Sequence, residues 1–138
     1  MTEIDTLCIY SDGASRGNPG EGGAGVVIRD QSGRELSSLQ RYLGLVTNNV
    51  AEYQALLLGL KEAQNLQARH LKLFLDSELV VKQVRGEYKV KNHGLLPLYE
   101  LAMEALEKFD SFEINYIPRE ENHEADALAN AAIDERTA

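Results

Sequence analysis

The chain has 138 residues and is 43% hydrophobic, which fits one globular domain, residues 1–138, with a buried core. Its 22 acidic residues outnumber 14 basic ones, and the formal net charge of -8 disfavours loose electrostatic binding to nucleic acid or to an anionic membrane surface. A single cysteine, Cys8, excludes an internal disulfide, and we find neither a signal-peptide pattern nor an apolar run long enough to span a bilayer. We therefore expect a cytoplasmic protein, monomeric, that binds any polyanion at a local site.

The first predicted strand is the apolar run that begins at Leu7, and Asp12 closes it. The following glycines, together with Asn18-Pro19, predict a turn over residues 13–20. A phosphate-binding glycine motif would open a helix, whereas this glycine-rich stretch leads into a second strand over Gly25 to Arg29, so a dinucleotide site is excluded. A glycine-rich hairpin in which Asp12 only stabilises the turn is the alternative interpretation.

Two further strands and a long helix follow in order. The turn sequence of residues 30–33 joins the second strand to a third over Leu36 to Leu43, which predicts an antiparallel meander. Apolar residues at helical spacing predict a helix from Thr47 to Gln67. Leu71 to Leu75 is the next strand and again ends on an acid, Asp76.

The rest of the chain completes an α/β fold with a five-stranded mixed sheet, an antiparallel meander plus parallel strands, flanked by helices. A right-handed helical crossover would place the fourth strand parallel to the first, with Asp12 beside Asp76. The remaining predicted elements are a short helix over Ser77 to Arg85 stopped by Gly86, a basic loop, a helix over Pro97 to Phe109, a strand over Phe112 to Ile117 and a helix from about Asn122 to Asp134.

Four acids are candidate ligands for a metal: Asp12, Glu52, Asp76 and Asp126. Singly, three of them have ordinary structural explanations: Asn49 and Glu52 form a capping-box pattern in the first turn of their helix, Asp76 can cap the next helix, and Asp126 lies near a helix start. Brought together, they would repel one another unless a cation bound. An oxygen-only ligand set favours Mg²⁺ or Mn²⁺, and two such ions can support phosphoryl transfer.

Four motifs, in this order, resemble type 1 ribonuclease H over nearly the whole chain: S-D-G-A-S-R-G-N-P-G, T-N-N-V-A-E-Y, L-D-S-E and A-D-A-L-A-N. The resemblance implies a ribonuclease H-like fold and an endonuclease that uses two Mg²⁺ ions, with Mn²⁺ able to substitute, to cut the RNA strand of an RNA/DNA hybrid, leaving 3′-hydroxyl and 5′-phosphate ends. It implies that the four acids are the catalytic metal ligands. It also implies contacts to the hybrid from Gly13, Asn18, Thr47, Asn48, Asn49 and Ser77.

The stretch from Gly86 to Leu96 is too short for the basic protrusion that many bacterial members carry, so the chain resembles the compact branch of the family. Basic residues remain in and before this loop, and Lys89 and Lys91 are candidate contacts to nucleic acid. An ordinary solvated loop is the alternative.

His123, three residues before Asp126, is a possible auxiliary to catalysis, although a surface histidine at a helix start is the simpler interpretation. Arg119 either contacts substrate or pairs with Glu120 or Glu121. Three rival functions stay open: a DNA or structured-RNA nuclease of the same fold, a hybrid-binding module without catalysis, and a structural domain whose acids are all caps.

Overall fold

The computed structural model describes residues 5–137, and its five strands form one mixed sheet in the order β3-β2-β1-β4-β5. The strands are β1 (Thr6–Gly17), β2 (Gly20–Asp30), β3 (Glu35–Val46), β4 (His70–Leu75) and β5 (Ser111–Tyr116). The helices are α1 (Asn48–Asn65), α2 (Glu78–Val84), α3 (Leu96–Leu106) and α4 (His123–Thr137), with a 3-10 turn at Arg119–Glu121. The predicted α/β class, meander and crossover are confirmed.

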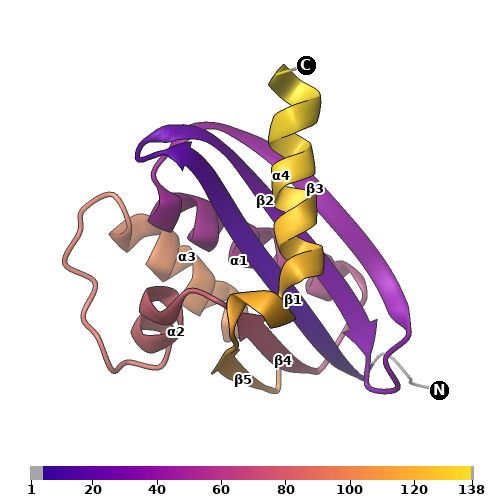
Figure 1. The fold of residues 1–138 in the computed structure, drawn as a ribbon. Coiled ribbons are helices and arrows are strands. Elements are labelled where there is room, and N and C mark those ends of the chain that lie inside the picture. The colour runs from indigo at the N-terminus through magenta and orange to yellow at the C-terminus, as the bar shows by residue number, and fades with distance from the viewer. Residues whose placement is uncertain (1–4, 138) are drawn as a thin grey trace.

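The sheet separates two unequal layers of helices (Figure 1). Helix α4 crosses the face of the meander, and α1, α2 and α3 lie on the opposite face. The main core lies on the α1 side, where alternate residues of the strands, such as Ile9 and Leu73, are fully buried against Leu56 and Leu60 of α1. Among residues 5–137, no helix is both long and apolar enough to cross a membrane.

The first strand is longer than its apolar pattern predicts. Strand β1 continues through Asp12 to Gly17 and pairs with β2 from Leu7 to Gly17, so the predicted strand end at Asp12 is wrong, and the predicted turn is confined to residues 18–19. The second strand likewise begins at Gly20 rather than Gly25. The hairpin contains glycines at positions where a helix backbone packs against it too closely for a side chain. A Cβ on Gly25, for example, would lie 2.1 Å from the Ala125 carbonyl oxygen of α4.

Several other element ends differ from the sequence-based bounds by one to three residues. Helix α3 starts one residue before Pro97 and ends at Leu106, three residues before the predicted Phe109. Helix α2 is shorter than predicted because Ser77 is its N-cap and Arg85 its C-cap. Gly86, at φ +83°, ends that helix as expected.

Candidate metal site

The candidate site forms where β1 and β4 separate. The last parallel pair of the two strands is Ser11 and Leu75, so Asp12 and Asp76 are the next residues across the ladder. Beyond this pair β4 has ended, whereas β1 continues with β2 on its other side. The neighbouring position predicted for Asp12 and Asp76 is therefore confirmed, although Asp12 lies in the middle of its strand.

Glu52 enters this gap from α1. The helix is capped by Thr47, whose hydroxyl accepts a hydrogen bond from Val50 N–H at 3.3 Å, and no acid lies in its first turn. The predicted capping box of Asn49 and Glu52 is therefore wrong. Glu52 Oε1 instead accepts a buried hydrogen bond from Gly13 N–H at 3.1 Å, so the β1 backbone fixes its carboxylate.

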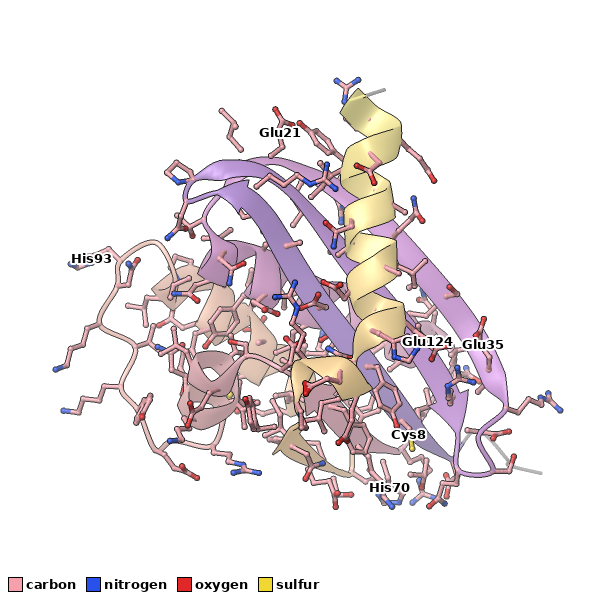
Figure 2. All side chains as sticks on the ribbon, viewed as in Figure 1. Cys8, Glu21, Glu35, His70, His93 and Glu124 are labelled. Carbon is pink, nitrogen blue, oxygen red and sulfur yellow. The ribbon has the colours of Figure 1, made fainter. Side chains whose placement is uncertain are left out.

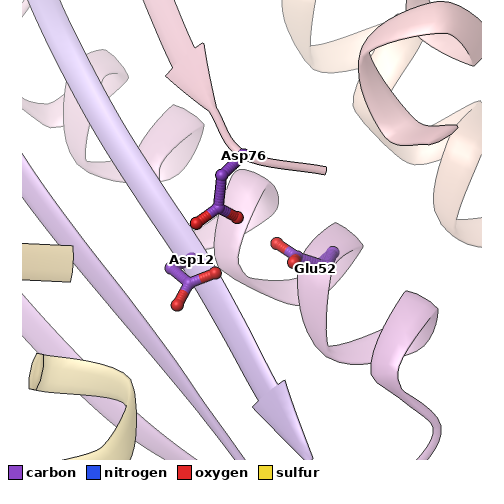
Figure 3. Close-up of side chains that lie close together, drawn as sticks. All are labelled: Asp12, Glu52 and Asp76. Carbon is purple, nitrogen blue, oxygen red and sulfur yellow. The ribbon is translucent and has the colours of Figure 1, made fainter. Parts of the chain in front are cut away.

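Asp12, Glu52 and Asp76 form the triad, with one oxygen of each within 4.8 Å of the others (Figure 3). Asp12 and Glu52 are each only 5% exposed. Burial, and then the charges of Glu52 and Asp76, raise the pKa of Asp12. Burial and the charge of Asp76 likewise raise the pKa of Glu52, against the Gly13 hydrogen bond, which lowers it. Gathering three carboxylates here therefore costs free energy unless a cation is bound.

Asp126 lies in the first turn of α4 and lines the same cavity of about 370 Å³ as the triad. It is outside the group of three but close to it, since a hydrogen-bonding contact with its carboxyl group contributes to the raised pKa of Asp12. Arg119 Nη2 lies 3.6 Å from Asp126 Oδ1. Within residues 5–137, Arg119 forms its ion pair with Asp126 and not with Glu120 or Glu121, the partners considered from the sequence; its alternative role, contact with substrate, stays a prediction.

The donor set fits a hard divalent cation. All the candidate ligand atoms are carboxylate oxygens, the ligands that Mg²⁺ and Mn²⁺ prefer. Among the described residues, no lysine or arginine forms an ion pair with Asp12, Glu52 or Asp76, because the two arginines that line the cavity pair elsewhere: Arg119 with Asp126 and Arg16 with Asp134. The triad therefore keeps a negative charge that a bound metal ion would neutralise.

Several residues implied by the resemblance have structural contacts next to the cavity. Asn18 Oδ1 accepts a hydrogen bond from Asn48 N–H at 3.0 Å, which ties the β1–β2 turn to the start of α1. Asn48 lines the cavity, and Asn49 follows it in α1. Ser77 caps α2 by accepting a hydrogen bond from Val80 N–H at 3.3 Å. These contacts fix polar side chains at the β1–β2 turn and at the starts of α1 and α2, and their contact with a substrate stays a prediction.

The basic residues after the third acid divide into two groups. Lys82 pairs with Glu78 at 2.9 Å, and Arg85 donates two hydrogen bonds to the Ile114 carbonyl oxygen. Lys89 and Lys91 are instead exposed on the loop between α2 and α3. That loop is the part of the predicted basic surface left open to a polyanion.

None of the three histidines lines the cavity. His123 is exposed at the start of α4, and its Nδ1 lies 3.3 Å from the Glu120 carbonyl oxygen. His93 projects from the loop between α2 and α3, and His70 is the first residue of β4, at the opposite end of that strand from Asp76 (Figure 2). An auxiliary role for His123 stays a prediction.

Three polar residues near Asp126 were missed from the sequence. Asn122 is 2% exposed and donates to the Ser11 carbonyl oxygen at 2.9 Å, which anchors the start of α4 beside β1. Arg16 and Asn130 both line the cavity. Asn130 ends the motif A-D-A-L-A-N, four residues after Asp126, and this helical spacing was the available signal.

We predict that the metal-free protein loses stability as pH rises. The raised pKa of Asp12 and of Glu52 means that the folded state holds protons which the unfolded state releases near pH 4. Their stabilising contribution is full below that pH and is lost as pH rises toward the folded-state pKa. Melting temperatures in EDTA at pH 5, 7 and 9 should therefore fall more in wild type than in Asp12→Asn.

Added Mg²⁺ should reverse this trend, because a cation binds the ionised carboxylates. The rise in melting temperature caused by Mg²⁺ should be larger at pH 9 than at pH 5, by several degrees. Subtracting the Asp12→Asn profile removes the titration of all other groups. If melting temperature falls with pH equally in the two proteins in EDTA, the proposed repulsion between the ionised triad carboxylates is contradicted.

Comparison with known proteins supports the geometry. Residues 10–132 match the model of a family described as reverse transcriptase-like. Ribonuclease HI of Halobacterium salinarum is 40% identical over 126 residues, 91% of this chain and 63% of that protein. The crystal structure of the Halobacterium RNase H1 superposes with a TM-score of 0.92, at 38% identity, over 94% of this chain and 98% of the solved one.

Two further relatives extend the comparison. The structure of LC11-RNase H1 in complex with an RNA/DNA hybrid has a TM-score of 0.92 and 39% identity, over 96% of this chain and 99% of that one. A bifunctional protein of Mycobacterium tuberculosis is 43% identical over 130 residues, 93% of this chain. The chain spans about a third, 35%, of that mycobacterial protein.

Proposed function

The chain belongs to the type 1 ribonuclease H family, and from that premise we propose that it is an endonuclease that hydrolyses the RNA strand of RNA/DNA hybrids, leaving 3′-hydroxyl and 5′-phosphate ends. The observation that carries the proposal is the triad of Asp12, Glu52 and Asp76 at the point where β1 and β4 separate. LC11-RNase H1 was solved with such a hybrid, which supports the hybrid as the substrate.

We propose Mg²⁺ as the physiological ion, two per site when the hybrid is bound, with Mn²⁺ able to substitute. The residues that would hold the metal are the triad and Asp126. Divalent ions bound there supply activation of a water molecule and stabilisation of the leaving oxygen. The protein contributes the placement of these ligands: the Gly13 N–H fixes Glu52, and the end of the β1–β4 ladder fixes Asp12 beside Asp76.

The hybrid would lie across the cavity mouth, where polar side chains from three segments meet. We propose that Gly13, Asn18, Thr47, Asn48, Asn49 and Ser77 contact its sugars and phosphates. Recognition of the RNA 2′-hydroxyl would explain a preference for RNA over DNA at the cut strand. Lys89 and Lys91, exposed on the loop after α2, would neutralise phosphates farther along the duplex. That the protein acts as a cytoplasmic monomer stays a prediction.

The experiment that tests this function is a gel assay with one labelled RNA strand. The RNA is presented paired to DNA, paired to RNA or alone, beside a labelled DNA duplex, and each substrate is incubated with Mg²⁺, with Mn²⁺ or with EDTA. We expect metal-dependent cutting of the RNA in the hybrid only. The product ends are checked by 5′-phosphate-dependent exonuclease digestion and by 3′ extension with a polymerase.

Asp76→Asn, purified in parallel, controls for nuclease carried over from the expression host. This variant should bind the hybrid without cutting it, because the substitution replaces a charged carboxylate of the triad with a neutral amide, which is a poorer ligand for the metal. Cutting of the DNA duplex would favour the rival nuclease of the same fold. Hybrid binding without cutting by wild type would favour the non-catalytic binding module.

A further inference from the structure

A chain of polar contacts joins the end of β1 to the Asp126 side chain. Arg16 Nη2 donates to Asn130 Oδ1 at 3.2 Å. Asn130 Nδ2 in turn donates to Asp126, to its carbonyl oxygen at 3.0 Å and its Oδ1 at 3.3 Å. Asp134 holds the other guanidinium nitrogen, Nη1, at 2.7 Å. Arg16, Asn130 and Asp126 all line the cavity of the triad.

The charges on either side give the Asn130 amide one orientation. A guanidinium group only donates hydrogen bonds and a carboxylate only accepts them, so the amide oxygen faces Arg16 and the amide nitrogen faces Asp126. Two residues fix the guanidinium: Asp134 on α4, by an ion pair, and Asn130 itself. A neutral side chain that can accept on one side and donate on the other is therefore required at position 130.

Asp126 needs such support because little else fixes its carboxylate. Its side chain is 27% exposed, and Arg119, whose own side chain is 78% exposed, attracts it from 3.6 Å. Its other polar neighbours are Asn130, which donates a hydrogen bond to it, and Asp12, whose pKa is raised in part by the Asp126 carboxyl group. Asn130 Nδ2 and Arg119 Nη2 both lie near the same oxygen, Oδ1, so loss of the Asn130 donor leaves Oδ1 with the longer contact, to a mostly exposed side chain.

We propose that Asn130, oriented by Arg16, is a positioning residue that holds the Asp126 carboxylate toward the triad and so raises the affinity of the site for divalent cations. The inference deepens the proposed function and rests on it, since the position of Asp126 matters for activity only if the cavity is the active site. Residues that orient metal ligands typically change metal affinity or activity by about 10- to 100-fold when they are replaced.

The test compares wild type with Asn130→Ala, Asn130→Asp and Arg16→Lys. The first measurement is the Mg²⁺ concentration at half-maximal thermal stabilisation, with no nucleic acid present, and the second is the Mg²⁺ dependence of hybrid cleavage. We expect Asn130→Ala to raise both midpoints about tenfold. Asn130→Asp should raise them as well, because a carboxylate only accepts hydrogen bonds and cannot replace the donor to Asp126. Arg16→Lys should have a smaller effect, because lysine keeps the positive charge but lacks the second guanidinium nitrogen, so it cannot contact Asp134 and Asn130 in the same way as Arg16.

Coupling between the two positions separates positioning from general destabilisation. The double variant Arg16→Lys with Asn130→Ala should match Asn130→Ala alone, because Arg16 acts through the amide. Asn65→Ala is the matched control, since Asn65 also lies on a helix and donates from Nδ2 to a carboxylate oxygen, Glu62 Oε1, at 3.4 Å. This variant should leave both Mg²⁺ midpoints unchanged.

An Asn130→Ala protein with the wild-type Mg²⁺ midpoint would overturn the inference, whether or not its melting temperature falls. If Asn130→Ala does not fold, Arg16→Lys decides, and an unchanged midpoint in that variant overturns the inference equally. Failure of the proposed function has a different signature: wild type would not cut the hybrid, while the thermal titration, which uses Mg²⁺ alone, would still report on Asn130.

Discussion

Asp12→Asn is expected to lower kcat by at least about 10³-fold, equivalent to about 4 kcal/mol of transition-state stabilisation, while the metal-free protein becomes more stable. The amide keeps the shape of the carboxylate but removes its charge from a cluster with Glu52 and Asp76. Activity falls because the substituted oxygen is a poorer cation ligand. Stability rises because the buried repulsion around Asp12 is relieved. Single-turnover cleavage rates and melting temperatures in EDTA measure the two effects.

Asp30→Asn is the matched control, because Asp30 is also a mostly buried strand aspartate, 7% exposed. Its Oδ1 accepts hydrogen bonds from Ser32 N–H, Ser32 Oγ–H and Arg34 N–H in the β2–β3 turn. This variant should lose stability and keep kcat, the opposite of Asp12→Asn. A kcat near wild type in Asp12→Asn would contradict its assignment as a metal ligand, and a lower melting temperature would contradict the charge repulsion.

The sheet topology and the meeting of the triad were predictable because each rests on a local pattern plus one chirality rule. Short apolar runs ending on acids predicted β1 and β4, and a right-handed crossover then required Asp12 and Asp76 to be neighbours. Both inferences are confirmed by the register of the parallel pair, which ends at Ser11 and Leu75.

The features that the sequence did not predict depend on contacts between segments that are far apart in the chain or belong to different elements. The second half of β1 has no apolar alternation, because Gly13 lies against the α1 backbone, and the pattern therefore predicts a turn. Glu52 fits a capping box by spacing, yet its partner is the Gly13 N–H, 39 residues away in the chain. The pairing of Arg119 with Asp126 in place of its sequence neighbours likewise depends on how the 3-10 turn at Arg119–Glu121 leads into α4.

Gly13→Ala should remove both stability and activity. A Cβ at this position would lie 2.1 Å and 2.2 Å from the Ala51 carbonyl carbon and oxygen and 2.4 Å from Glu52 N. All three are backbone atoms of α1, so the helix must move away from β1. We expect a loss of about 3 kcal/mol in the free energy of unfolding, the upper part of the usual range for overpacking. Urea denaturation measures it.

Activity should fall in the same variant because the movement of α1 carries Glu52 with it and lengthens the 3.1 Å hydrogen bond from the residue 13 N–H. Gly59→Ala is the matched control, since Gly59 also lies on α1 and faces β1. Its Cβ would meet only side chains, Ile9 Cγ2 at 3.0 Å and Val26 Cγ1 at 3.4 Å, which can adjust. Gly59→Ala should therefore keep kcat and lose less stability. Equal losses of kcat in the two variants would show that general loosening of α1, rather than the placement of Glu52, limits catalysis.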